Sequence, residues 1–308
     1  MCIPRLEIQE KSGTNWIKLR SVFTPFILIL IVMFFFTVPI SLAQSKMKKV
    51  NLNTGVKLKY VVEGPEDGIP IIFLHDATDS SYSWCLTIPF LSDTYRTYAL
   101  DLRGHGNSEK PLHGYSIVQF SEDVIAFIDE LAIERAVMDG HSLGSLIAHQ
   151  LASVYADRVS HLVLLSSATT AVGNEIYKFL WDEIIGRPEF QDPIDPQFIR
   201  ELKTGPNPID PVFFENVVTE AAKVPAQVWK LTFRGLLTND HTDFLDDINI
   251  PTLIMWGSLD VFFSLSDQQA LQAALGITPD FVVFDNAGSN IHWEEPQEVA
   301  SEIRFFIE

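Results

Sequence analysis

The sequence predicts an α/β fold in which a mostly parallel sheet is flanked by helices. Short apolar stretches alternate with longer amphipathic stretches, the order expected of strand–helix–strand units. Several strand candidates are apolar at every position, as strands covered on both faces are. A Gly-x-Ser-x-Gly run lies between one of these strands and the helix that follows it.

The elements follow one another along residues 44–308. We expect strands at 58–62, 69–74, 97–100, 136–138, 162–165, 252–256 and 281–284. We expect helices at 117–131, 145–155, 266–275 and 295–307.

Residues 170–239 interrupt this rhythm. The segment is rich in proline and aromatic residues and predicts three or four short helices between two strands. We interpret it as an inserted helical lid, so that residues 44–169 and 240–308 form the core. Its aromatic side chains either line a pocket or pack the lid onto the core: Phe179, Trp181, Phe213, Phe214, Trp229 and Phe233.

Residues 1–43 have the pattern of a secretory signal peptide. Basic residues precede an uncharged apolar run at 22–40, and Ser41-Leu42-Ala43 places small residues at the −3 and −1 positions of a cleavage site. The alternative is an uncleaved membrane anchor, because the run approaches the length that spans a bilayer. Either way the basic flank predicts export of the remaining chain, to a secreted or periplasmic location.

The chain carries a formal net charge of −18 at pH 7. This acidity argues against nucleic acids and anionic membrane surfaces as partners. No dinucleotide fingerprint, phosphate loop or His-Glu-x-x-His sequence is present, and the histidines lack the spacing of metal ligands. We therefore expect no cofactor and no metal site.

The run from Gly140 to Gly144, with Ser142 at its centre, has the composition of a nucleophile elbow. The flanking glycines let strand and helix approach each other closely at a strained turn. The turn leaves the serine hydroxyl at a helix N-terminus, where backbone N–H groups favour negative charge. Ser142 is the candidate nucleophile.

Further motifs, in the same chain order, resemble the α/β-hydrolase family over nearly all of residues 50–308. Asp101 to Ser108 matches the D-x-R-G-x-G-x-S loop of its lidded branch of esterases and cofactor-free haloperoxidase-like enzymes. Pro251 to Asp260 matches the strand and turn that deliver the catalytic acid, and His292 to Pro296 matches the start of the last helix. The resemblance implies an α/β-hydrolase fold and a Ser-Asp-His triad with Asp260 as the acid.

The general base is where the chain departs from the family. Relatives read G-H-x-x-H-W-E-x-P, with the first histidine catalytic, whereas this chain has Ser289 at that position and retains only His292. A serine cannot accept a proton at neutral pH. Either His292 substitutes, since residues three apart on a helix share a face, or the triad is broken.

The oxyanion loop departs as well. The family's donors correspond to the backbone N–H groups of Ala77 and Leu143, but relatives carry His-Gly where this chain has His75-Asp76. Asp76 lacks the freedom of glycine at positive φ. Its carboxylate either opposes a developing oxyanion or points away and caps the turn.

Two functions remain open. The first is an exported serine hydrolase that transfers the acyl group of a small apolar ester or related carbonyl substrate to water. The alternative is a non-catalytic member of the fold that binds a small apolar ligand beneath the lid. Residue 289 distinguishes the two functions, because a serine hydrolase needs a general base for Ser142 and this residue stands at the position of that base.

Overall fold

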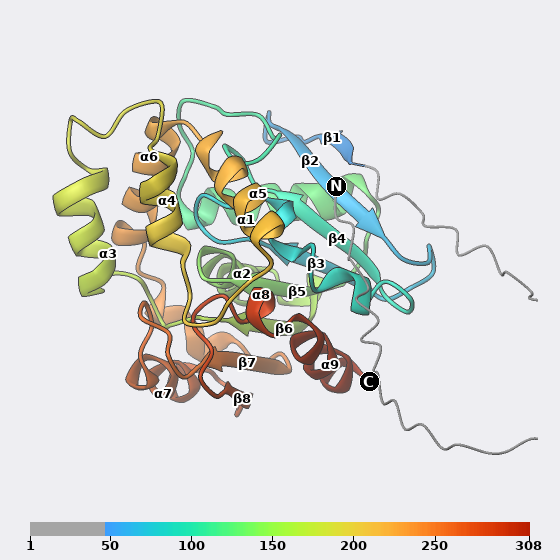
Figure 1. Ribbon diagram of the computed structural model, residues 1–308. Helices are drawn as coiled ribbons and strands as arrows, with labels where there is room; N and C mark the ends of the chain where they lie inside the picture. Colours follow the sequence, from blue (N-terminus) through green and yellow to red (C-terminus); the bar gives the residue numbers. More distant parts are fainter. Residues whose placement is uncertain (1–46) are drawn as a thin grey trace, which may run out of the picture. The chain divides into compact units, whose positions relative to one another are not determined.

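The computed structural model describes residues 47–308, and the predicted signal peptide or anchor at 1–43 lies outside this part. The described residues form an eight-stranded sheet in the order β1-β2-β4-β3-β5-β6-β7-β8 (Figure 1). The strands are β1 (Lys48–Asn51), β2 (Lys57–Glu63), β3 (Pro70–Leu74), β4 (Arg96–Asp101), β5 (Ala136–His141), β6 (Val159–Leu165), β7 (Thr252–Gly257) and β8 (Asp280–Phe284). The β1–β2 and β2–β4 pairs are antiparallel, and the remaining pairs, from β4–β3 to β7–β8, are parallel.

The helices belong to the core or to the segment between β6 and β7. The core helices are α1 (Ile117–Glu130), α2 (Leu143–Val154), α7 (Leu265–Ala274), α8 (Ile291–Glu294) and α9 (Pro296–Ile307). The inserted helices, within the lid segment 170–239, are α3 (Glu175–Leu180), α4 (Pro196–Lys203), α5 (Pro211–Ala222) and α6 (Ala226–Thr238). The expected fold class, a mostly parallel sheet flanked by helices with helical insertions, is confirmed.

The sheet separates two apolar layers, and alternate side chains of β3 pack into one layer or the other. Ile72 and Leu74 pack with α1, α2 and the inserted helices, whereas Ile71 and Phe73 pack with α9 on the opposite face. Side chains of a strand alternate between faces, so a strand covered on both sides must be apolar throughout. Its continuous apolar run is therefore a direct consequence of the helices on both faces.

The parallel strands bring their carboxyl ends to one edge of the sheet. The loops that leave β3, β5, β6, β7 and β8 all begin there, and the inserted helices lie over this edge (Figure 1). Ligand sites of open α/β sheets lie at this edge.

No helix among residues 47–308 combines the length and the apolar character needed to cross a bilayer.

The contact between α2 and the sheet tolerates no side chain at Gly144. A Cβ there would lie 2.0 Å from the Leu74 carbonyl oxygen, which belongs to a central strand and cannot move independently. We expect Gly144→Ala to lower the free energy of unfolding by about 1–3 kcal/mol, the cost of overpacking a core. Urea denaturation measures this. Ser153→Ala, on the same helix but without an added carbon, should stay within about 0.5 kcal/mol of the parent; equal midpoints for the two variants would contradict the clash.

Candidate active site

Ser142 occupies a strained turn between β5 and α2. Its backbone has φ 51° and ψ −111°, a left-handed φ that non-glycine residues rarely adopt. A Cβ at Gly140 would lie 2.3 Å from the carbonyl oxygen of Gly144, so both glycines are required for the turn to close. The surrounding packing thus holds Ser142 in the geometry predicted for a nucleophile elbow.

The Ser142 hydroxyl is buried and hydrogen-bonded to a side chain from the lid segment. Its Oγ lies 3.0 Å from the hydroxyl oxygen of Tyr177, which comes from α3. Burial raises the pKa of Tyr177 well above its ordinary value, and the nearby Asp76 carboxylate adds to this effect. Tyr177 therefore stays neutral and is not a base, and either of the two hydroxyl groups can be the donor of this hydrogen bond.

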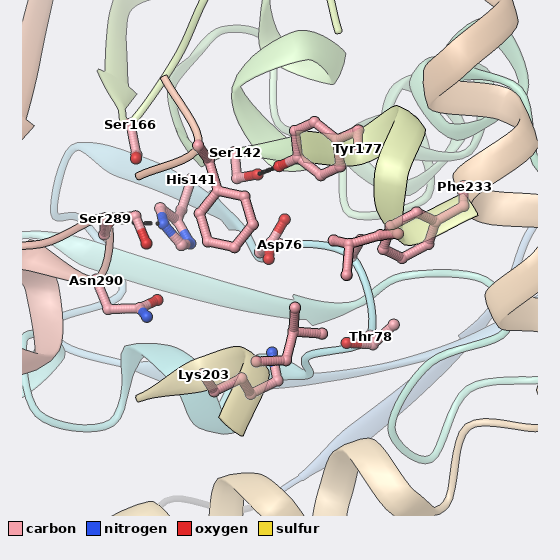
Figure 2. A pocket seen from close by; sticks show the side chains of 14 residues that line it. Asp76, Thr78, His141, Ser142, Ser166, Tyr177, Lys203, Phe233, Ser289 and Asn290 are labelled. Atoms are coloured by element: carbon pink, nitrogen blue, oxygen red, sulfur yellow. Dashed lines mark hydrogen bonds between the residues drawn. The ribbon is translucent and has the colours of Figure 1, made fainter. Parts of the chain in front are cut away.

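A small cavity lies beside the Ser142 hydroxyl (Figure 2). Its walls come from β5 and the loops after β3, β5, β6, β7 and β8, and from the inserted helices, which supply apolar side chains together with Tyr177 and Lys203. The lining residues are Asp76, Ala77, Thr78, His141, Ser142, Ser166, Tyr177, Leu180, Leu202, Lys203, Phe233, Phe262, Ser289 and Asn290. Its volume of about 30 Å³ has room for roughly two water molecules, so a substrate needs the walls to open.

Asp260 lies in the turn after β7, as expected for the acid, but no imidazole of residues 47–308 hydrogen-bonds its carboxylate. Its Oδ1 accepts the backbone N–H groups of Phe262 at 2.8 Å and Phe263 at 3.2 Å, and its Oδ2 accepts the Ser166 hydroxyl. Burial raises the pKa of Asp260 to about 6, while these hydrogen bonds oppose the rise. Ser166 thus occupies the oxygen of Asp260 that would otherwise accept from a histidine.

Ser289 precedes α8 and is not part of the helix, so it does not share a helical face with His292. His292 is fully buried, and its Nε2 lies 3.0 Å from the Ser83 hydroxyl. Its ring packs between Trp84 and His141, with centroids 4.6 and 4.5 Å away. Within residues 47–308 no histidine hydrogen-bonds Ser142, and the structure does not bring His292 to the nucleophile. The helical-face argument for a substitute base was wrong because the helix begins after residue 289.

Of the two expected oxyanion donors, Ala77 lines the cavity, and the backbone N–H of Leu143 is in contact with Asp76. Asp76 Oδ1 accepts the backbone N–H of Leu143 at 3.4 Å, a long hydrogen bond from the first residue of α2. The carboxylate therefore faces the N-terminus of α2, where a developing oxyanion would lie. Asp76 does not need the freedom of glycine here, because the left-handed residue of the loop is Thr78, at φ 70°.

Sequence reasoning missed the contributions from the inserted helices. Lys203, at the end of α4, is 5% exposed and forms an ion pair with Asp79 from the loop after β3. Burial raises the pKa of Asp79 to about 6 although the Lys203 ammonium opposes the rise. Neither Lys203 nor Tyr177 lies in a motif, and only the docking of α3 and α4 on the core brings them to Ser142.

Comparisons with known proteins agree with this fold. The family profile of the alpha/beta hydrolase fold matches residues 69–296. The chain is similar to epoxide hydrolase 3 of Xenopus tropicalis, with 26% identity over 83% of this chain and 76% of the relative. It is also similar to 3-oxoadipate enol-lactonase 1 of Acinetobacter baylyi, with 26% identity over 79% of this chain and 90% of the relative.

Solved structures with the same fold include an esterase from Thermogutta terrifontis, with a TM-score of 0.73 and 22% identity over 85% of this chain and 98% of that one. E-2-(acetamidomethylene)succinate hydrolase has a TM-score of 0.74 and 23% identity over 85% of this chain and 99% of that one. The chain belongs to the α/β-hydrolase fold family, as the sequence motifs predicted, and hydrolases are prominent among its relatives.

The raised pKa of Asp260 predicts how stability depends on pH. The folded-state value near 6 lies above the ordinary value of 3.8, so the folded state binds this proton more tightly than the unfolded state. This contribution is present at low pH and is lost as pH rises from about 4 to 6, and it amounts to roughly 3 kcal/mol at about 1.4 kcal/mol per pH unit.

Asp260→Asn removes this titration while keeping an acceptor oxygen. Urea denaturation at pH 4, 5, 6 and 7 should show the parent losing stability relative to Asp260→Asn across that window. Parallel profiles for the two proteins would show that Asp260 does not titrate there.

Proposed function

We propose that the protein is an exported serine hydrolase that transfers the acyl group of a small apolar ester, or a related carbonyl compound, to water. The observation that carries the proposal is the strained turn at Ser142, which holds a buried hydroxyl at the N-terminus of α2 beside a cavity. Such strain persists only where the surrounding structure enforces it, and it is typical of functional sites.

The reaction would follow the chemistry of an acyl-enzyme. Ser142 Oγ attacks the carbonyl carbon, its proton passes to a base, and the carbonyl oxygen becomes an oxyanion facing the N–H groups of Leu143 and Ala77. Collapse expels the alcohol, which takes up a proton, and a water molecule then releases the acid by the same route. Because no described imidazole reaches Ser142, the first proton transfer limits the rate in the native chain.

An apolar groove supports an apolar substrate. It has a volume of about 710 Å³, is lined largely by side chains of α3, α4 and the loop after β7, and adjoins the Ser142 cavity. The groove and the cavity share five lining residues: Leu180, Leu202, Phe262, Ser289 and Asn290. A substrate can therefore lie in the groove with its carbonyl group directed at Ser142 once these shared side chains move.

One observation favours the alternative function, a protein that binds a small apolar ligand without turning it over. The Asp76 carboxylate faces the Leu143 N–H, and a negative charge there opposes an oxyanion. With Ser289 at the place of the base, both catalytic requirements are weakened at once. Measurements on variants of these two residues separate the proposals.

Restoring the base should restore turnover. Ser289→His restores an imidazole at the position where the family carries its base, and we expect kcat/KM on a short-chain p-nitrophenyl ester to rise by about 10²-fold or more, the usual contribution of general base catalysis. Ser142→Ala is the blank, alone and in the Ser289→His background. If the parent already hydrolyses the ester well above the blank, another base acts. If the double variant with Ser142→Ala keeps the activity, Ser142 is not the nucleophile.

Removing the carboxylate at residue 76 should raise the rate further. In the Ser289→His background, Asp76→Gly frees the Leu143 N–H, and an oxyanion donor is worth about 10²-fold in kcat. Asp76→Asn is the matched control, because it removes the charge while keeping the bulk. We expect kcat to rise in the order Asp, Asn, Gly at this position. Equal kcat values for the three would show that Asp76 does not affect the oxyanion.

A further inference from the structure

His141 carries a buried nitrogen without a partner beside the Ser142 cavity. Its ring is 2% exposed, and its Nε2 lies 2.9 Å from the backbone carbonyl oxygen of Ser289. A carbonyl oxygen only accepts, so Nε2 carries the proton and Nδ1 presents a lone pair. Nδ1 is buried and has no hydrogen-bond partner among residues 47–308. Burial also lowers the pKa of His141, which keeps the ring neutral.

Two carboxylates lie within reach of this histidine. One oxygen each of Asp76 and Asp79 and one ring nitrogen of His141 all lie within 4.8 Å of one another. Figure 2 shows the His141 ring between Ser289 and Asp76. Tetrahedral ligands at about 2.1 Å from a shared metal ion lie roughly 3.4 Å apart, so each ligand atom would have to move inward by up to roughly 0.8 Å.

We propose that Asp76, Asp79 and His141 form a site for one divalent metal ion of the Zn²⁺ class. Imidazole and carboxylate ligands suit such ions. A metal-binding histidine commonly donates its other ring N–H to a backbone carbonyl, as His141 does to Ser289. The sequence did not predict this site, because the histidine is distant in the chain from the two aspartates.

Lys203 is the competitor for the metal. Its ammonium forms an ion pair with Asp79 Oδ1, while Asp79 Oδ2 lies 3.4 Å from the Ser83 hydroxyl. A divalent ion can bind only if the ammonium withdraws or turns away, since two cations on one carboxylate repel each other. Binding of the metal ion therefore displaces the Lys203 ammonium from Asp79, and this displacement lowers the affinity for the metal.

A metal ion here would reverse the electrostatic effect of Asp76. The carboxylate opposes an oxyanion at the Leu143 N–H, whereas a metal bound to it would place positive charge at the same end of the cavity. This effect on the rate rests on the proposed hydrolase function. Binding of the metal does not, because it is measured without substrate.

The test is titration of the purified full-length protein, first treated with chelator, with Zn²⁺ by isothermal calorimetry. We expect one Zn²⁺ per chain, at least tenfold weaker binding in Asp76→Asn, and at least tenfold tighter binding in Lys203→Met. Asp280→Asn, an exposed carboxylate on β8, is the matched control and should bind as the parent does. Circular dichroism and a thermal melt confirm that each variant is folded.

Substitution with Co²⁺ gives a second readout, because Co²⁺ held in a four-coordinate protein site absorbs visible light much more strongly than hydrated Co²⁺, and Asp76→Asn should weaken this absorption. The proposal is overturned if the parent does not bind Zn²⁺, or if Asp76→Asn binds as tightly as the parent, which would place the metal on the acidic surface. Unchanged affinity in Lys203→Met would overturn the exchange with Lys203. If the variants bind Zn²⁺ as expected but added Zn²⁺ does not change the rate of ester hydrolysis, the metal site stands and only its effect on catalysis is disproved.

Discussion

The close approach of α2 to the central strands is the constraint on which the site depends. Gly140 and Gly144 remove every side-chain atom from this contact, and the chain between them has no room except in the left-handed turn at Ser142. Backbone strain costs of order 1–3 kcal/mol are sustained only by strong surrounding packing. Here that packing is the buried sheet. Its stability offsets the backbone strain at Ser142, and the strained turn directs the hydroxyl to the cavity.

The strand ends then decide which chemical groups surround Ser142. Loops from β3, β6, β7 and β8 deliver Asp76, Ser166, Asp260 and Ser289 to one edge of the sheet. Each carboxylate at this edge must find donors, because buried charges without partners are costly. Asp260 accepts from two backbone amides and Ser166, whereas the Asp76 carboxylate has, among the described residues, only the long hydrogen bond from Leu143. The carboxylate of the acid, Asp260, therefore has several hydrogen-bond donors, whereas the carboxylate of Asp76 in the oxyanion loop has few.

Local patterns in the sequence predict most of the core. The apolar runs correspond to β2 to β8, because strands covered on both faces leave little choice of residue type. β1 carries two lysines on a short edge strand, and charged edges give no apolar signal. Positions fixed by tertiary docking were not predictable in the same way. Tyr177 and Lys203 reach the site through helices whose placement depends on side-chain packing rather than on any motif.

The two departures from the family pattern are best understood together. Ser289 removes the imidazole, but its backbone carbonyl fixes the proton of His141 on Nε2 and so leaves Nδ1 as a lone pair. Asp76 adds a carboxylate on the side of that ring, and Asp79 adds a second one whose charge Lys203 balances. Neither change alone creates a new donor set, since a lone histidine or a lone carboxylate holds a cation weakly. Together they place two carboxylates and an unpartnered imidazole nitrogen where the family has its proton-transfer site, and this set of acceptors, with Lys203 as its one balancing charge among the described residues, favours a cation over an anion.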